Sequence, residues 1–290
     1  GGPGLFRLQP SFADPYLIYI HSLAIISALI LAAFLFKRTP LSSFGAWPTA
    51  TLMLALAARY LYFAATPIGT RGYDTGGHLE YLQWVAERLS LPPFHGGWEF
   101  HQAPLYYILG AAVLCLAAAA GATTETALSS VQFVSFLASS LTIMIAAAIF
   151  SMVPWPARPM AAKSCAVAAV GFAPSLIFTA AWISNDVLYT CLSAVAIAAA
   201  CRWWPAPSWA LWITAVAGAA AATVTKTSGV VLIATIFFLL FIRPALRTAT
   251  RFSAALFAAV TFYASLGWYV VLRVFQDGQR AYVGNIEALN

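Results

Sequence analysis

Apolar runs that approach or reach 20 residues follow one another through most of this chain, and short polar segments separate them. A helix needs about 20 apolar residues to cross the hydrocarbon core of a bilayer, where every backbone polar group must be satisfied internally. The runs are rich in Ala, Leu, Phe and Trp and lack the alternation of a membrane barrel strand. With 62% hydrophobic and 8% charged residues, the chain is predicted to be an all-α, polytopic membrane protein.

Nine runs are candidates for hydrophobic segments, with boundaries uncertain by several residues. We expect residues 1–290 to form one transmembrane module of eight or nine segments. Residues 275–290 resemble the start of an outer loop, so we expect the chain to be truncated there. The runs are Tyr16–Phe36, Ala46–Ala65, Ala103–Ala120, Ala127–Phe150, Lys163–Ala181, Val187–Ala200, Ser208–Val224, Thr227–Ile242 and Phe252–Val274.

Positively charged residues gather in short segments beside the ends of these runs. The positive-inside rule places such segments on the cytoplasmic face of a membrane. The net charge of +6 is therefore explained by the orientation of the chain in the membrane. A nucleic-acid partner is therefore not expected. The segments are marked by Lys37 with Arg38, Arg158 with Lys163, Arg202, and Arg243 with Arg247 and Arg251.

The same rule places residues 67–102 on the outer face. Three runs separate Asp74 from Asp186, and an odd number of crossings would put these two acids on opposite faces. Because the loop after Phe150 is positive and therefore inside, residues 103–150 must make one net crossing. We predict that one of the two runs in this region is re-entrant or interfacial.

The outer segment 67–102 is a polar island that contains an amphipathic pattern. Four of the nine carboxylates and three of the four histidines lie between Arg71 and Gln102. We predict an amphipathic helix at the membrane surface, ended by Pro92 and Pro93. Its apolar stripe is Leu79, Leu82, Val85 or Ala86, and Leu89, flanked by Tyr81 and Trp84, and its polar face is His78, Glu80, Gln83, Glu87 and Arg88.

Asp74 lies immediately before this predicted helix. An aspartate there can cap the helix by accepting hydrogen bonds from its first N–H groups, and this role is compatible with a catalytic one. Two glycines, Gly76 and Gly77, weaken the first turn by roughly 1 kcal/mol each. Such glycines indicate a position where another group approaches the backbone closely.

A second helix start follows at Ala103, with Pro104 in its first turn. The free N–H groups and positive dipole end of a helix favour anions, so a phosphate is a candidate ligand, with His101 and Gln102 as additional donors. The neighbouring aromatic residues are better explained as an interfacial belt. They are Trp98, Tyr106 and Tyr107.

Three further charged residues lie in or between apolar runs. Asp186 begins the run at Val187, where a helix cap and a functional acid are about equally favoured. Lys226 lies among hydroxyl residues at a junction predicted to face outside, where it either extends to the lipid headgroups or holds an anion. Arg59 lies inside a run and requires a partner, for which Asp74 or another outer acid is a candidate.

The order and spacing of these segments resemble the GT-C superfamily of membrane glycosyltransferases, which use polyprenyl-phosphate sugars. The resemblance is to its protein mannosyltransferase and aminoarabinose transferase families, and it covers about residues 51–268. No single motif is specific. The segments that carry it are the Arg59 helix (Leu56–Tyr62), Tyr73-Asp74 with His78, His101–Tyr107, Ser184-Asn185-Asp186 and Thr225–Gly229.

The resemblance implies a GT-C-like core with Asp74 as general base or acceptor ligand and Asp186 beside it. The donor phosphate would be bound by Lys226, His101, Gln102 and Arg71, while His78, Glu99 and Arg59 would bind the acceptor or support the site. Many family members carry a second acid where this chain has Thr75, and a second proline where it has Ala103. These departures leave the involvement of a divalent metal open, and no other cofactor is indicated.

The expected partners are a polyprenyl-phosphate sugar donor, membrane lipid and a lipid, glycan or protein acceptor. The expected location is a bacterial inner membrane, with the site facing the periplasm or cell exterior as part of cell-envelope chemistry. Two alternatives remain. One is a non-catalytic lipid-binding protein or transporter with an ion or substrate site at Asp74, Asp186 and Lys226. The other is an inactive relative that keeps the fold.

Overall fold

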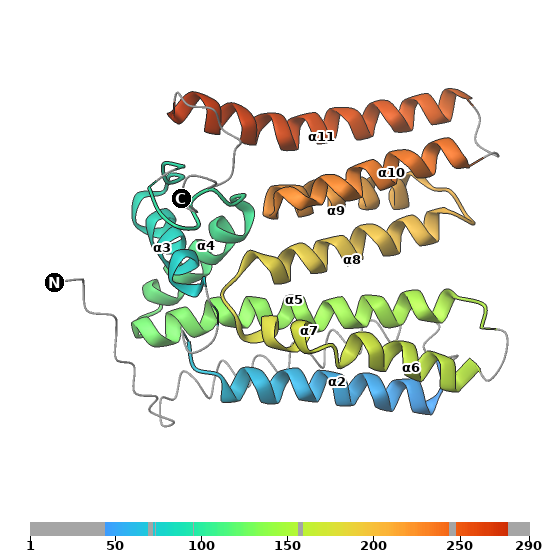
Figure 1. Cartoon of the computed structure of the whole chain (residues 1–290), viewed down its shortest axis with the longest axis horizontal. Helices are drawn as coiled ribbons and strands as arrows, with labels where there is room; N and C mark the ends of the chain where they lie inside the picture. Colours follow the sequence, from blue (N-terminus) through green and yellow to red (C-terminus); the bar gives the residue numbers. More distant parts are fainter. Residues whose placement is uncertain are drawn as a thin grey trace, which may run out of the picture. The chain divides into compact units, whose positions relative to one another are not determined.

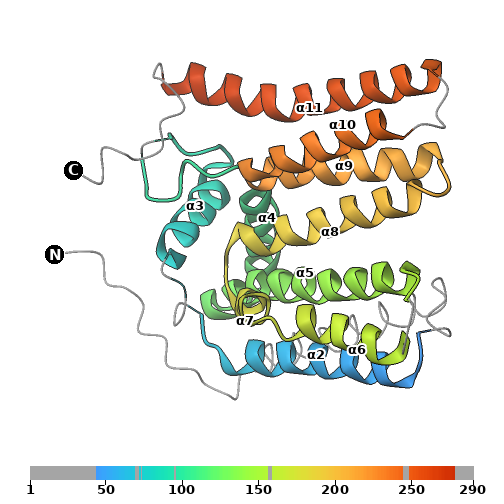
Figure 2. The same ribbon diagram turned by 45° about the vertical axis from the view of Figure 1, so that its right-hand side comes forward.

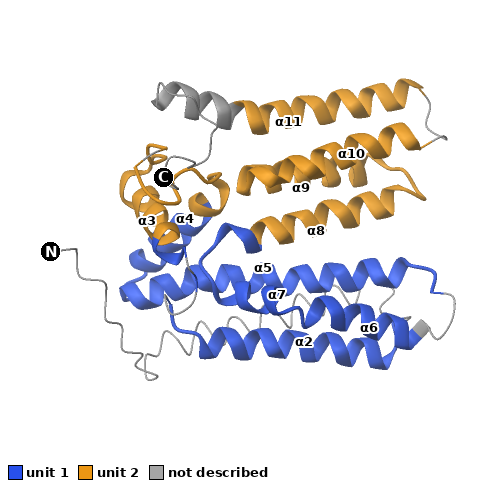
Figure 3. Ribbon diagram, viewed as in Figure 1, with its two compact units in different colours: residues 1–76, 109–187 blue, residues 77–108, 188–290 orange. Residues whose placement is uncertain are grey.

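Helices are the regular elements of the chain, as the sequence predicts, and no strand occurs in the part that the structure describes. The structure is a computed structural model, and it describes residues 44–68, 72, 74–94, 96–155, 159–243 and 248–277. The predicted run Tyr16–Phe36, Lys37 with Arg38, and the tail after residue 277 lie outside these residues. Contacts divide the chain into two compact units, and each unit draws on two stretches of sequence (Figure 3).

Unit 1 comprises residues 1–76 and 109–187. In it, α2 (Ala46–Ala65) packs against α5 (Thr124–Met152) and α6 (Pro159–Gly171), as Figure 1 shows. The short α7 (Pro174–Phe178) and the 3-10 turn η2 (Thr179–Ala181) continue from α6. Where α2, α5 and α6 meet, the apolar core is formed by Phe44, Leu52, Ala55, Ile143, Ala147 and Val167.

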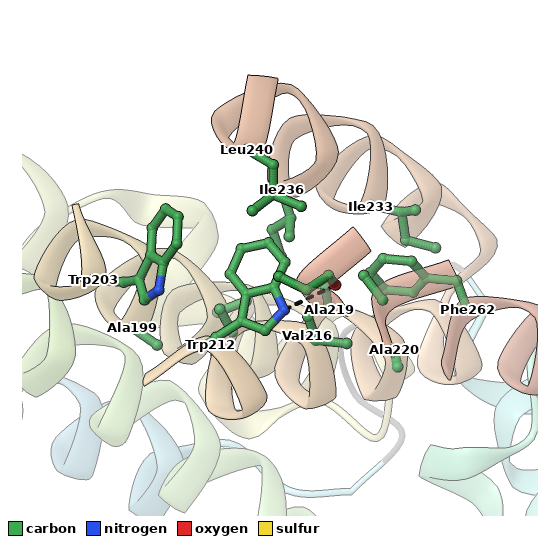
Figure 4. Close-up of a cluster of buried hydrophobic side chains, with 14 residues drawn as sticks. Ala199, Trp203, Trp212, Val216, Ala219, Ala220, Ile233, Ile236, Leu240 and Phe262 are labelled. Carbon is green, nitrogen blue, oxygen red and sulfur yellow. Dashed lines mark hydrogen bonds between the residues drawn. The ribbon is translucent and has the colours of Figure 1, made fainter. Parts of the chain in front are cut away.

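Unit 2 comprises residues 77–108 and 188–290. Its helices α9 (Trp209–Thr225), α10 (Val230–Ile242) and α11 (Thr248–Asp277) pack together, and they stay side by side in both views (Figures 1 and 2). Helix α8 (Asn185–Trp203) joins the same apolar core. Figure 4 shows this core, in which the indole N–H of Trp212 donates to the carbonyl of Ala254 at 3.1 Å.

Three helices are long and apolar enough to cross a membrane: α5, α8 and the stretch Thr248–Gly267 of α11. A fourth candidate is the pair Met160–Gly171 and Pro174–Ala181, which bends by 57° at the break. Pro174 begins α7 at this break, and proline removes a helical hydrogen bond and clashes with the preceding turn. Among the described residues, these helices qualify by length and composition alone.

The region 103–150 contains one helix of spanning length. Helix α4 (Leu105–Ala119) has 15 residues and falls among the shorter apolar helices, whereas α5 has 29. In Figure 2 the ribbon of α4 runs across the direction of α5. By length and composition, α5 is a candidate membrane span, whereas α4 is not, and the prediction that one of the two runs is re-entrant or interfacial stays a prediction.

Helix α3 (Thr75–Arg88) forms where the amphipathic pattern predicts it, but its buried face differs from the predicted stripe. His78, assigned to the polar face, is only 1% exposed, whereas Leu89, assigned to the apolar stripe, is 87% exposed. The helix ends before Leu89, which takes a positive φ of 50°, so the helical spacing no longer applies there. The residues buried on α3 are Thr75, His78, Tyr81, Leu82 and Val85.

Arginines gather at one end of the α8–α11 group. The guanidinium of Arg243, at the end of α10, donates to the carbonyl of Trp203 at the end of α8. Arg251, near the start of α11, donates to the carbonyl of Arg243. Since α8 also carries Arg202 in its last turn, three of the predicted cytoplasmic arginines share this end.

Candidate functional site

The predicted site residues fall into both units. Unit 1 holds Asp74, Asp186 and Arg59, and unit 2 holds His78, Glu99, His101, Gln102 and Lys226. Arg71 lies outside the described residues.

Both candidate site acids of unit 1, Asp74 and Asp186, stand at the start of a helix. Asp74 is half-buried and directly precedes α3, which is the cap position that the sequence predicts. Gly72 gives the chain a φ of 138° there, and this left-handed backbone favours glycine. Asp186 was predicted as a possible cap of the run at Val187, but α8 begins at Asn185, so Asp186 lies inside the first turn and Ser184 takes the cap position. The backbone N–H of Asp186 donates to the hydroxyl of Ser184, so Ser184 satisfies a donor at this helix start.

A glutamine that the sequence analysis missed joins the two segments that lead to these acids. The amide nitrogen of Gln132, on α5, donates to the carbonyl of Thr66 at 3.0 Å and to that of Ala181 at 2.6 Å. Thr66 directly follows α2, on the segment that leads to Asp74. Ala181 ends η2, on the segment that leads to Asp186. Gln132 is 4% exposed, so both bonds are shielded from solvent. Its position as an amide within a predicted apolar run was the signal that could have revealed it.

We expect Gln132→Leu to increase the mobility of the two segments that the Gln132 amide holds through Thr66 and Ala181. Two buried carbonyls would lose their donor, and a loss of about 1–3 kcal/mol in the free energy of unfolding follows. Hydrogen exchange measured by mass spectrometry should accelerate at residues 182–186. The matched control is Gln83→Leu, on a half-buried position of α3, which should change neither quantity. If hydrogen exchange at residues 182–186 were unchanged in Gln132→Leu, the hydrogen bonds of Gln132 would not be what holds this segment.

Arg59 is fully buried, and its partners are not the predicted acids. Its Nε donates to the hydroxyl of Ser139 at 3.1 Å, and its Nη1 donates to the carbonyls of Ala55 and Gly171. Gly171 ends α6 at the helix break, where carbonyls lose their helical donors. The hydroxyl of Ser139 in turn donates to the carbonyl of Leu176 in α7. Arg59 thus supports the broken helix that leads to Asp186.

In unit 2, His78 belongs to a buried polar and aromatic cluster. Its Nδ1 lies 2.6 Å from the hydroxyl of Tyr107, and the ring of Tyr107 stacks on that of Tyr81 with centroids 3.7 Å apart. Tyr106 and Tyr107 are 1% and 0% exposed, so the predicted interfacial belt is wrong for both. Trp98, at 56% exposure, is the one residue of the predicted belt that reaches the surface.

Tyr107→Phe is expected to destabilise the protein by about 1–3 kcal/mol, because it removes a buried hydrogen-bond partner of His78 while keeping the ring stack. Unfolding in detergent micelles would measure the loss. Tyr263→Phe provides the control, since Tyr263 is 79% exposed and should show no change. Equal stability of the two variants would mean that the His78–Tyr107 contact contributes nothing.

The remaining polar residues of this segment form a local network. The amide of Gln102 donates to a carboxylate oxygen of Glu99 at 2.9 Å and lies 3.3 Å from the exposed ring of His101. Pro104 precedes α4, where its carbonyl accepts from Ile108, instead of lying in the first turn. The predicted close approach at Gly77 is confirmed, because an added Cβ would lie 2.7 Å from the side chain of Glu99. At Gly76 nothing described lies within 4 Å of such a Cβ.

Lys226 ends α9 and is half-buried. Its backbone N–H donates to the carbonyl of Ala222, which completes the helix, and a cation at this end interacts favourably with the helix dipole. Of the three hydroxyls beside it, that of Thr225 is already bonded to the carbonyl of Ala221. Thr227 and Ser228 lie in the turn η3 (Thr227–Gly229), where Ser228 is exposed.

Comparison with known proteins found no family model, no curated protein and no solved structure that matches the chain. Among the described residues, no three His, Cys, Asp or Glu side chains group as metal ligands would. The candidate residues therefore form two groups: Asp74 and Asp186 in unit 1, which follow the segments held by Gln132, and the histidine, glutamate and glutamine network in unit 2.

Proposed function

We propose that the protein is a membrane glycosyltransferase of the GT-C type, which moves a sugar from a polyprenyl-phosphate donor to an acceptor. The observation that carries the proposal is the two hydrogen bonds of Gln132. Through the carbonyls of Thr66 and Ala181, this one side chain links the segment that leads to Asp74 with the segment that leads to Asp186. An enzyme that uses two acids from distant parts of its sequence needs such a fixed link. The resemblance in segment order supplies the reaction class, and the site chemistry below is consistent with it.

In this proposal Asp74 is the general base. It takes the proton of the acceptor hydroxyl while that oxygen bonds to the anomeric carbon, and the bond from this carbon to the phosphate oxygen breaks. The polyprenyl phosphate leaves with the bonding electron pair. Asp186 assists at the acceptor side, and the charge gathering on the phosphate is offset by Lys226, His101, Gln102 and Arg71.

The supporting residues have defined contacts in the structure. Arg59 holds the helix break before Asp186, His78 is fixed by Tyr107, and Glu99 by Gln102. We place the reaction at the outer face of a bacterial inner membrane, since the segment 67–102 lacks the positive-inside signature and the chain has no glycine-rich nucleotide loop. A lipid-linked donor suits a compartment without a nucleotide pool.

The test is release of polyprenyl phosphate from a panel of labelled polyprenyl-phosphate sugars by the full chain in lipid nanodiscs, with candidate lipid, glycan and protein acceptors supplied. Turnover that is lost in Asp74→Asn would support the proposal. Binding of the lipid phosphate without turnover would indicate a non-catalytic relative. Neither binding nor turnover would favour the transporter, whose site would be Asp74, Asp186 and Lys226.

A further inference from the structure

An open apolar groove of about 260 Å³ runs between α8 and α10 in unit 2. Its polar lining atoms are few, and the hydroxyl of Thr235 is already bonded to the carbonyl of Val231. Such a groove suits a hydrocarbon chain better than water or a peptide backbone, because it offers polar groups few hydrogen-bond partners. Its main lining side chains are Ile197, Cys201, Trp204, Leu232, Ile236 and Leu239.

The groove is open at the surface of the unit. Ile197 and Trp204 are 45% and 39% exposed, and the thiol residue Cys201 is also exposed. Because α8 is long and apolar enough to cross a membrane, this surface would meet lipid tails. Lipid contact alone would give no selectivity, so the charge at the end of the groove decides what binds there.

One end of the groove is strongly basic. The guanidinium of Arg243 lies 6.0 Å from the centre of the Trp204 ring, which lines the groove, and 4.9 Å from that of Trp203. Its hydrogen bond to the carbonyl of Trp203 uses one of five N–H donors. Arg251 is held against the carbonyl of Arg243, and the exposed Arg202 directly follows Cys201 in the chain.

No acidic residue lies near these arginines in the sequence, since the one acid of α8, Asp186, lies in its first turn and Arg202 in its last. Between Asp186 and Asp277 the sequence contains no Asp or Glu, while every charge in that stretch is positive. Unbalanced cations beside an apolar groove are complementary to a molecule that carries a phosphate next to a hydrocarbon chain. Basic pockets between transmembrane helices bind anionic lipid headgroups in this way.

We propose that this groove is a binding site for an anionic glycerophospholipid, with one acyl chain between α8 and α10 and the phosphate at Arg202, Arg243 and Arg251. The site is separate from the proposed reaction centre. Arg202 lies in the last turn of α8 and Asp186 in its first, and the 19 residues of this helix span roughly 28 Å. The proposal therefore stands or falls independently of glycosyl transfer.

Cys201 provides the readout, because its thiol lines the groove. In a full-length variant whose other cysteines are replaced by serine, we expect phosphatidylglycerol titrated into micelles to slow maleimide labelling of Cys201, and phosphatidylcholine to have little effect. Arg202→Gln with Arg251→Gln should weaken the protection by roughly fivefold for each arginine. Added salt should weaken it further. A variant that retains Cys115 alone reports labelling outside the groove.

Each alternative result would overturn the proposal. Equal protection by phosphatidylcholine would indicate contact with lipid tails alone, and protection unchanged by the arginine substitutions would remove the headgroup assignment. Protection by polyprenyl phosphate but not phosphatidylglycerol would identify the groove as a donor-lipid site. Native mass spectrometry of the parent and the arginine variants measures retained lipid directly, with Arg88→Gln, on α3, as the matched control.

Discussion

Asp74→Asn is expected to lower the rate of polyprenyl phosphate release by about 10²–10⁴-fold, the usual contribution of a general base. Asparagine has the shape of aspartate but cannot take the acceptor proton. It is also as good a helix cap as aspartate, so α3 should remain as stable as before. The substitution therefore separates the catalytic role of Asp74 from its capping position. Initial rates and thermal unfolding midpoints of the same preparations would measure the two effects.

Glu80→Gln is the matched control, because Glu80 is an exposed acid on the same helix. It should keep both the parental rate and the parental unfolding temperature. If Asp74→Asn retained the parental rate, Asp74 would not be the base. If its rate fell together with its unfolding temperature, the loss would report a structural role instead of a catalytic one.

Ser139→Ala is expected to give the largest loss of stability, about 2–5 kcal/mol. The hydroxyl of Ser139 accepts from Nε of the buried Arg59 and donates to the carbonyl of Leu176, so alanine leaves both groups without a partner. Arg59 has little capacity to compensate, because its Nη2 already lacks a hydrogen-bond partner among the described residues. A buried cation that loses a partner is costly in a low-dielectric interior. Unfolding in mixed detergent micelles measures the difference.

The neighbouring serine makes this prediction specific. Ser140 is as buried as Ser139, but its hydroxyl has no hydrogen-bond partner in the described structure. Ser140→Ala should therefore leave the free energy of unfolding unchanged or raise it, since it removes an unsatisfied polar group. Equal losses from the two alanine variants would show that packing on α5, and not the Arg59 network, determines the effect.

Part of the candidate site is visible in the sequence because it depends on local signals. Asp74 and Asp186 were found as acids beside apolar runs, and the helix break before Asp186 follows from Pro174. The partner of Arg59 was not found, because carbonyls at a helix end carry no sequence signature. Gln132 was also missed, since its two partners lie in segments far from it along the chain.

The amphipathic pattern of α3 illustrates the limit of periodicity. Spacing predicted a helix over this region, and the helix is present from Thr75 to Arg88. The same spacing placed His78 on the polar face, opposite the apolar stripe, yet Tyr107 supplies a buried hydrogen-bond partner for it. Periodicity thus predicts that a helix forms, whereas packing against the segment that contains Tyr107 determines which face of the helix is buried.

By itself the sequence determined the class of structure, because the length and apolarity of each run are properties of a single segment and only helices satisfy their backbone in such runs. It also determined which loops carry charge. The tertiary structure decided which polar groups meet: Arg59 with the end of α6, Gln132 with two separate loop stems, and Arg243 with the end of α8. A buried donor needs an acceptor wherever the fold presents one, and that position depends on packing between segments distant in the chain.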